Sequence, residues 1–144
     1  MEKERAMAIV IGLIMISSLL GYALNSSVIN QEPPKMNIPT IVDRELSPQE
    51  VVYILRTGRV IIENFYPENC SDCLNRNTML ENFAERYSDY VVLVEVPGNL
   101  TRFQIIGSGG KITKLNETID QKELMKIFCQ VAIGLPKECL FETI

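Results

Sequence analysis

The chain has 144 residues, a net charge of −4 and no histidine. This length fits one ordinary domain with a short appendage, and Lys and Arg do not cluster into the basic face that nucleic-acid binding requires, so we expect no nucleic-acid partner. The lack of imidazole excludes Ser-His-Asp catalysis, Cys-His catalysis and His-ligated zinc.

The N-terminal segment predicts a transmembrane helix. Residues 6–24 carry no charge, and a helix of that length nearly spans the ~30 Å hydrocarbon layer of a bilayer. Lys3 and Arg5 precede this stretch, whereas the first positive residue behind it is Lys35. This asymmetry predicts a single-pass protein of the cell membrane. Its N-terminus would be cytoplasmic, and its folded part would lie outside the cytoplasm, where disulfides persist.

The same segment also fits a cleaved signal peptide. Gly21 and Ala23 are small residues at the two places that cleavage after Ala23 requires, and cleavage would give a secreted protein. The apolar stretch is longer than the core of a usual signal peptide, so we expect residues 1–25 to remain as a signal anchor. Residues 26–43 are polar and contain three prolines, which predicts an extended linker before a domain of residues 44–144.

The first half of the domain predicts helix, strand and helix. Ser47 to Glu50 form a capping box with proline at the first helical position, and Gly58 stops this helix. Residues 60–66 are a β-rich run typical of a buried strand. A second helix follows, because five residues fall on one stripe at helical spacing: Cys73, Leu80, Phe83, Ala84 and Tyr87.

The second half predicts three strands and a last helix. Residues 90–96 are an apolar strand, and residues 102–106 and 111–115, joined by GSGG, form a hairpin. The last helix begins at Asp120 and runs to about residue 132, before a Gly/Pro break. This order of elements predicts an α/β fold with a central mixed β-sheet and helices on its faces.

Cys70 and Cys73 lie between the first predicted strand and the second helix. They are three positions apart, which is close enough for a disulfide. Cys73 shares the helical stripe and should be buried. Cys70 precedes the stripe and should be exposed at the helix N-terminus, which stabilises a thiolate, so we expect Cys70 to have the lower pKa. The negative charges of Asp72 and Glu68 oppose this, which slightly favours a reductant or an isomerase-like exchanger.

Cys129 and Cys139 flank the Gly/Pro break after the last helix. Outside the cytoplasm this spacing favours a structural disulfide, which contributes on the order of 2.5–3 kcal/mol in the chain-entropy model. A second redox pair is the alternative. A zinc site would need all four cysteines as ligands, and Cys129 and Cys139 are more widely spaced than the close pairs of structural zinc sites, so we expect no metal.

Three segments resemble the thioredoxin superfamily: the strand VIIENFY, the stretch PENCSDC opening a helix, and the tail RFQIIGSGGKITKLNETIDQKELMKIF. The resemblance implies a thioredoxin-like three-layer fold and an enzyme of thiol–disulfide exchange, with Cys70 attacking and Cys73 resolving. It implies no bound cofactor. The implied partners are protein thiols and disulfides and a protein electron donor or acceptor, for which a membrane protein is a candidate. The expected neighbours of the redox site are Tyr66, Asn69, Asp72, Thr101 and Arg102.

The sequence departs from this family at three places. The family has a buried acid six positions before its first cysteine, where this chain has Asn64, and Glu63 should face the opposite side of the sheet. Only residues 97–101 stand where the family has a helix. The family's cis-proline is replaced by Thr101 or Arg102, so a trans bond is expected. The missing cis-proline and the missing buried acid favour an alternative function, a non-catalytic thioredoxin-like binding module with structural disulfides.

Overall fold

The computed structural model describes residues 35–140. This part of the chain contains one mixed sheet of five strands, β1 (Ile41–Val42), β2 (Val60–Tyr66), β3 (Val91–Pro97), β4 (Arg102–Ile106) and β5 (Ile112–Lys114). The strand order is β1-β3-β2-β4-β5, with β1 and β2 parallel to β3, and β4 antiparallel to both β2 and β5. The predicted transmembrane helix lies outside residues 35–140, and no helix within them is long and apolar enough to cross a membrane.

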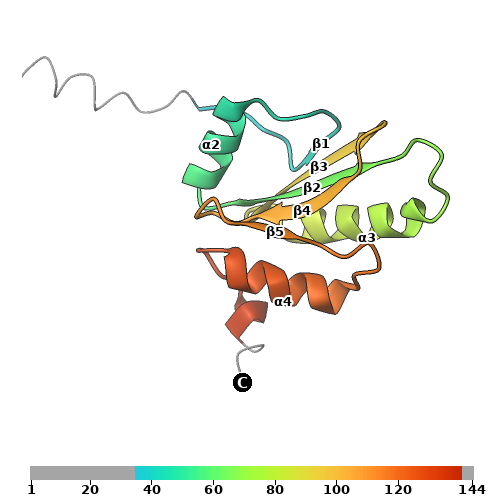
Figure 1. Ribbon diagram of the computed structural model, residues 1–144. Coiled ribbons are helices and arrows are strands. Elements are labelled where there is room, and N and C mark those ends of the chain that lie inside the picture. The colour runs from blue at the N-terminus through green and yellow to red at the C-terminus, as the bar shows by residue number, and fades with distance from the viewer. Residues whose placement is uncertain (1–34, 141–144) are drawn as a thin grey trace, which may run out of the picture. The chain divides into compact units, whose positions relative to one another are not determined.

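Helices cover both faces of the sheet (Figure 1). Helix α2 (Pro48–Arg56) lies on one face, while α3 (Cys73–Arg86) and α4 (Gln121–Val131) lie on the other, and a short 3-10 helix, η1 (Lys137–Leu140), follows α4. Side chains of β2 alternate between the two faces: Ile61 and Phe65 pack in the core under α2, and Val60 and Ile62 pack in the core under α3 and α4. The predicted α/β fold with a central mixed sheet is confirmed.

The domain begins earlier in the chain than the predicted boundary at residue 44. Ile41 and Val42 form the edge strand β1, in register with Leu93 and Val94 of β3. Val42 is only 4% exposed, and Ile38 also belongs to the core under α2. Proline-rich sequence predicts extended backbone, which an edge strand also uses, so the local pattern did not distinguish a linker from a strand.

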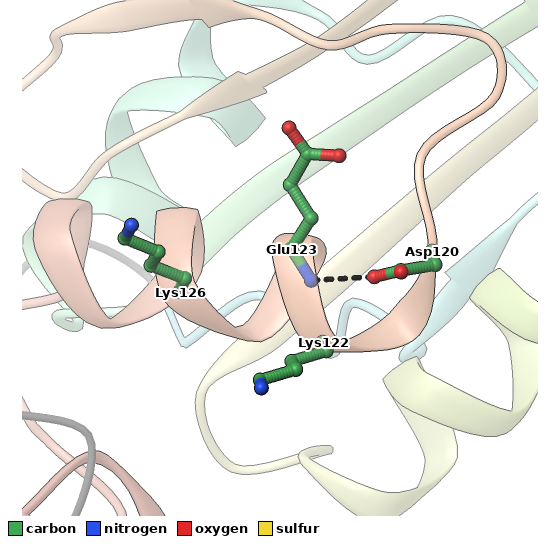
Figure 2. Close-up of a pocket in the computed structure, with 4 residues that line it drawn as sticks. All are labelled: Asp120, Lys122, Glu123 and Lys126. Carbon is green, nitrogen blue, oxygen red and sulfur yellow. Dashed lines mark hydrogen bonds between the residues drawn. The ribbon is translucent and has the colours of Figure 1, made fainter.

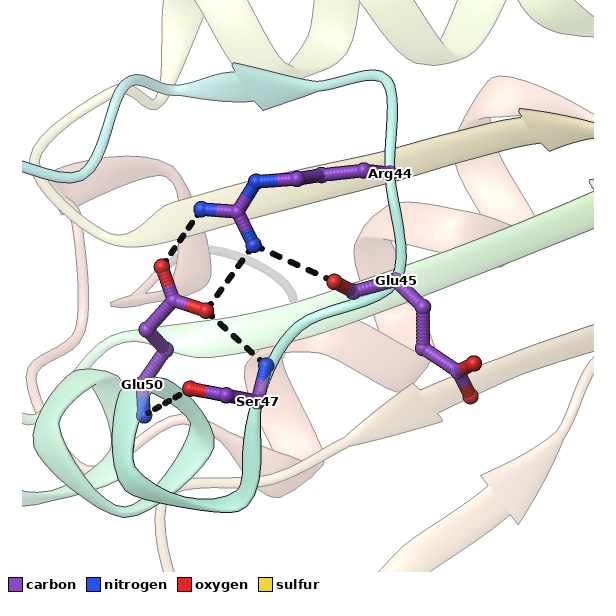
Figure 3. Close-up of polar contacts among 4 residues, drawn as sticks. All are labelled: Arg44, Glu45, Ser47 and Glu50. Carbon is purple, nitrogen blue, oxygen red and sulfur yellow. Dashed lines mark hydrogen bonds and ion pairs between the residues drawn. The ribbon is translucent and has the colours of Figure 1, made fainter.

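The start of α2 confirms the predicted capping box (Figure 3). Ser47 Oγ accepts from the Glu50 backbone N–H, and the Glu50 carboxylate accepts from the Ser47 backbone N–H. Arg44 adds two charged contacts to Glu50, at 2.6 and 2.9 Å. These contacts with Arg44, together with those from Ser47, lower the pKa of Glu50 to about 2. The connection from β1 is thereby fastened to the first turn of α2.

Candidate active site

Cys70 and Cys73 form a disulfide at the junction of β2 and α3, with their Cα atoms 5.3 Å apart. The chain turns before the first sulfur, since the Cys70 backbone N–H donates to the Pro67 carbonyl at 3.1 Å. Cys70 is half-buried, whereas Cys73, the first residue of α3, is 5% exposed. Cys73 is buried as predicted, whereas Cys70 is half-buried where the sequence predicted an exposed residue.

The first turn of α3 lacks a side-chain cap. Asp72 occupies the N-cap position with a helical backbone conformation, and its side chain makes no capping hydrogen bond. Asp72 and Asn69 are both exposed beside the disulfide. Because the backbone N–H groups of an uncapped first turn favour a negative charge, this end of α3 suits a thiolate.

Arg76 brings a positive charge to the buried sulfur. Its Nη2 donates to Cys73 Sγ at 3.5 Å, and its guanidinium carbon lies 4.9 Å from the centre of the Phe103 ring. Arg76 Nε is buried and finds no hydrogen-bond partner among the described residues. Sequence reasoning considered only the charges between and before the cysteines and missed this residue. The i, i+3 spacing from Cys73 along a helix is the signal that would have found it.

A buried acid, Glu95, lies on the face of the sheet that α3 covers. Asn64 is fully buried, and its Nδ2 donates to Asn77 Oδ1 at 2.9 Å and to Glu95 Oε1 at 3.1 Å. Glu95 is 8% exposed and stands beside Asn64 in the parallel register of β2 and β3. Burial raises the pKa of Glu95 to about 7, and the charge of Glu81 acts in the same direction, whereas the hydrogen bond from Asn64 and the charge of Arg76 oppose the shift.

Position 64 thus carries an amide instead of the family's acid, but Glu95 of the neighbouring strand β3 places a carboxyl group beside it. As predicted, Glu63 faces the other side of the sheet, where it accepts from Gln104 Nε2 at 2.6 Å. The sequence did not predict Glu95 as a site residue. Strand register decides which residue stands beside Asn64, and no local pattern in the chain indicates that register.

The remaining expected neighbours of the redox site are Tyr66, Thr101 and Arg102. Tyr66 ends β2 half-buried, and its carbonyl accepts from the Gly98 N–H at 2.9 Å. Thr101 is exposed immediately before β4. Arg102 turns to the α2 side, where it stacks on Phe65 at 4.2 Å and pairs with Glu63 and Glu45. The Arg102 side chain is therefore not brought together with the cysteines. Among residues 35–140 every peptide bond is trans.

Cys129 and Cys139 form the second disulfide, with their Cα atoms 5.4 Å apart, and join the end of α4 to η1. In Figure 1, β2 passes into α3 at the right-hand end of the domain, whereas the last turn of α4 and η1 lie towards the left. The structure thus separates the two disulfides. Within residues 35–140, no group of three or more His, Cys, Asp or Glu residues is placed to hold a metal ion.

Two surface depressions lie away from the cysteines. One is formed by the first turns of α4 and is lined by Asp120, Lys122, Glu123 and Lys126 (Figure 2). Within it, Asp120 caps the helix by accepting from the Glu123 N–H at 2.8 Å. The other lies on the α2 side of the sheet and is lined mainly by Phe65, Val96 and the connection after β3. Neither depression is lined by Cys70 or Cys73.

The strand order, the mixed sheet and a C-x-x-C disulfide opening the helix after the central strand β2 are those of a thioredoxin-like fold. No protein-family model and no curated protein matches the sequence. Similar solved structures are thioredoxins.

The sequence identity, coverage and TM-score of three of these similar structures are as follows. Chloroplastic thioredoxin z is 21% identical, with 67% of this chain and 97% of that chain covered and a TM-score of 0.49. A mutant thioredoxin from Halobacterium salinarum is 14% identical, with 73% and 100% covered and a TM-score of 0.49. The first thioredoxin domain of mouse protein disulfide-isomerase A4 is 13% identical, with 76% and 94% covered and a TM-score of 0.48.

Proposed function

We propose that this protein is an extracytoplasmic thiol–disulfide oxidoreductase that exchanges electrons through a Cys70/Cys73 dithiol–disulfide couple. The observation that carries the proposal is the unequal burial of the two sulfurs at the start of α3. A partner's sulfur can approach the half-buried Cys70, while the buried Cys73 reacts only within the chain. Exchange by thiolate attack needs this asymmetry, because one sulfur must meet the partner and the other must release it.

The proposed exchange is balanced without a cofactor. The Cys70 thiolate attacks a partner's disulfide, one partner sulfur leaves as a thiolate, and a mixed disulfide forms. The Cys73 thiolate then attacks Cys70, the Cys70–Cys73 bond forms, and the second partner sulfur leaves. The partner gains two electrons and two protons, and the chain loses them. In the opposite direction, a partner dithiol reduces the Cys70–Cys73 disulfide by the same steps, and a second protein restores the starting state.

The proposed location rests on the sequence of the leader. An uncharged segment preceded by Lys3 and Arg5 supports a membrane anchor with the domain outside the cytoplasm. A membrane-impermeant thiol reagent tests this in intact cells. The Cys73→Ala variant leaves Cys70 as the reactive thiol and should be labelled without permeabilisation. A Glu2→Cys variant that lacks both active-site cysteines should be labelled only after permeabilisation. The reverse pattern would refute the orientation.

Redox titration tests the exchange itself. We expect a reversible Cys70/Cys73 couple with a potential well above about −300 mV, because structural disulfides usually lie below that value. The measurement equilibrates the purified domain with thiol–disulfide buffers and quantifies free Cys70 and Cys73 by mass. A pair that stays oxidised at that poise would contradict the proposal.

Trapping identifies the partner. In the Cys73→Ala variant the mixed disulfide at Cys70 cannot be resolved, so partner proteins should accumulate in covalent complexes that a reducing agent releases. The matched control is Cys70→Ala, which keeps the buried sulfur and should trap little. Equal capture by both variants would show that the sulfurs do not have the proposed roles.

The second candidate function is a non-catalytic binding module. The short trans connection of residues 97–101 favours it, since the family's helix and cis-proline are both missing there. A module of this kind requires the fold and not the thiols. If the protein is such a module, replacing both Cys70 and Cys73 with Ser leaves its function in cells intact. If it is an oxidoreductase, the same double variant loses that function.

A further inference from the structure

We propose that Arg76 is a catalytic residue that stabilises the thiolate of Cys73, and so controls how fast mixed disulfides form and resolve. The inference rests on the proposed exchange at Cys70 and Cys73 and assigns to it a group that the motif itself does not contain. The cation acts on the buried sulfur, whereas the helix N-terminus was expected to act on the exposed one.

The contact between Arg76 and the disulfide carries the inference. Nη2 of Arg76 lies 3.5 Å from Cys73 Sγ, and the guanidinium is held against the Phe103 ring of β4. A disulfide sulfur is neutral and a weak acceptor, so the oxidised protein offers this cation a poor partner. Within residues 35–140 the buried Nε has no hydrogen-bond partner. A thiolate at Cys73 would place a full negative charge against Arg76, so the reduced state and the mixed disulfide satisfy Arg76 better than the oxidised state does.

The charged groups that act on one another beside this contact are Arg76, Glu95 of β3 and Glu81 of α3. Asp72 and Glu68 precede the first turn of α3 in the chain and are also acidic. On the facing strands, Asn64 of β2 and Phe103 of β4 are neutral. Among these residues, Arg76 is the one that carries a positive charge. Burial raises the pKa of Glu95 to about 7, although the charge of Arg76 lowers it. An ionised Glu95 therefore competes with Cys73 for Arg76 above that pH, and the effect of Arg76 on Cys73 should be greatest at lower pH, where Glu95 is largely neutral.

The same contact acts in both directions of exchange. When a mixed disulfide resolves, Cys73 gives its proton to water and attacks Cys70 as a thiolate. The Cys70–partner bond breaks, and the partner sulfur leaves with the electron pair and takes a proton from water. When a partner attacks Cys70 of the oxidised protein, Cys73 is the leaving group. A lower pKa of Cys73 supplies more thiolate in the first case and a better leaving group in the second.

Ionisation of Cys73 tests the contact without requiring any exchange. In a Cys70→Ser background, the ultraviolet absorbance of the thiolate reports the pKa of Cys73. Arg76→Met should raise that pKa by about one unit, a tenfold loss of thiolate below the pKa. Arg76→Lys should keep most of the charge and most of the effect. Arg86→Met, in the last turn of α3, is the matched control and should change nothing. An unchanged pKa in Arg76→Met would overturn the inference.

The rate of resolution separates an electrostatic role from a structural one. The reduced protein with both cysteines reacts with an aromatic disulfide, and release of the second aromatic thiol reports the attack by Cys73. A thiolate of higher pKa is scarcer but more nucleophilic, with a Brønsted slope of about 0.4–0.5. Arg76→Met should therefore be about threefold slower than the parent near pH 6 and about threefold faster near pH 10. Slower resolution at both values would indicate a structural defect and overturn the inference.

The two proposals fail in different ways. If Arg76→Met shifts the pKa of Cys73 but no partner exchanges with the Cys70/Cys73 couple, the oxidoreductase proposal fails and the charge contact stands. If exchange occurs and the pKa of Cys73 does not depend on Arg76, only the present inference fails.

Discussion

Buried polar side chains gather between the strands β2 and β3 and the helix α3 that begins at Cys73. Asn64 donates to both Asn77 and Glu95, while its own Oδ1 is buried without a hydrogen-bond partner in the part of the chain that the structure describes. Such groups cost stability, since each loses water and regains only part of its hydrogen bonding. Glu95 interacts with the charge of Arg76, which in turn donates to Cys73, so this cost falls where charge would change in the proposed exchange. Single residues at this site can therefore be tested through stability as well as activity.

The first prediction concerns Glu95 and pH. Its pKa is raised from 4.5 to about 7, so the folded state holds the proton more tightly than the unfolded state does. The contribution of Glu95 to stability is therefore fully present below about pH 4.5 and is lost as the pH rises to about 7. Glu95→Gln keeps an acceptor for Asn64 and cannot ionise. We expect it to match the parent near pH 4 and to exceed the parent by up to about 3 kcal/mol near pH 8.

Urea unfolding across this pH range is the measurement. Glu85→Gln removes an exposed carboxylate from α3 and serves as the control, with no comparable gain near pH 8. A constant difference between Glu95→Gln and the parent at all pH values would show that Glu95 does not titrate in this window.

At the scale of elements, the β4–β5 hairpin is held against the end of α4. The Ser108 hydroxyl accepts from the Ile133 N–H at 3.0 Å and lies 3.4 Å from the Val131 carbonyl. Gly107 approaches the same helix end so closely that an added Cβ would lie 2.8 Å from the Val131 carbonyl oxygen. The missing side chain at Gly107 is what lets the hairpin and helix meet.

The second prediction follows from this close approach. Gly107→Ala forces the hairpin and α4 apart, and we expect a loss of about 1–3 kcal/mol in the free energy of unfolding. Gly109→Ala is the matched control, because a Cβ there meets nothing within 4 Å. Denaturant unfolding of both variants provides the comparison, and equal stabilities for the two would contradict the packing argument.

Across the whole domain, the two disulfides have separate surroundings. One opens α3 beside a charged cluster, and the other joins α4 to η1 at the far end of the sheet (Figure 1). Cys139 is 4% exposed and belongs to the core under α3 and α4. Because exchange requires direct contact between sulfurs, this arrangement favours a stabilising role for the second pair.

The third prediction concerns this second pair. Replacing both Cys129 and Cys139 with Ser should lower the free energy of unfolding by about 2.5–3 kcal/mol, because the unfolded chain is no longer constrained. The reduction potential of Cys70/Cys73 should stay unchanged. Denaturant unfolding and redox titration of the same variant test both statements. A folded double variant that no longer exchanges with partner disulfides would instead identify a second redox pair.

Signals carried by neighbouring residues determined the type and position of several helices and strands of this protein. The capping box at Ser47, the β-rich run before Cys70 and the helical stripe from Cys73 each predicted an element that the structure contains. They succeeded because caps, strand alternation and helical spacing depend on residues within about one or two turns of each other. The difference in burial between Cys70 and Cys73 came from the same local spacing.

Tertiary structure alone decided what surrounds the buried sulfur. Glu95 meets Asn64 although 31 residues separate them, because the pairing of β2 with β3 sets that register. The pairing of β1 with β3 likewise drew residues 41–42 out of the predicted linker and into the sheet. Register depends on how whole strands bury their faces together, and no short stretch of sequence contains that information. Local sequence thus determined where the disulfide forms, and the fold decided which charges act on it.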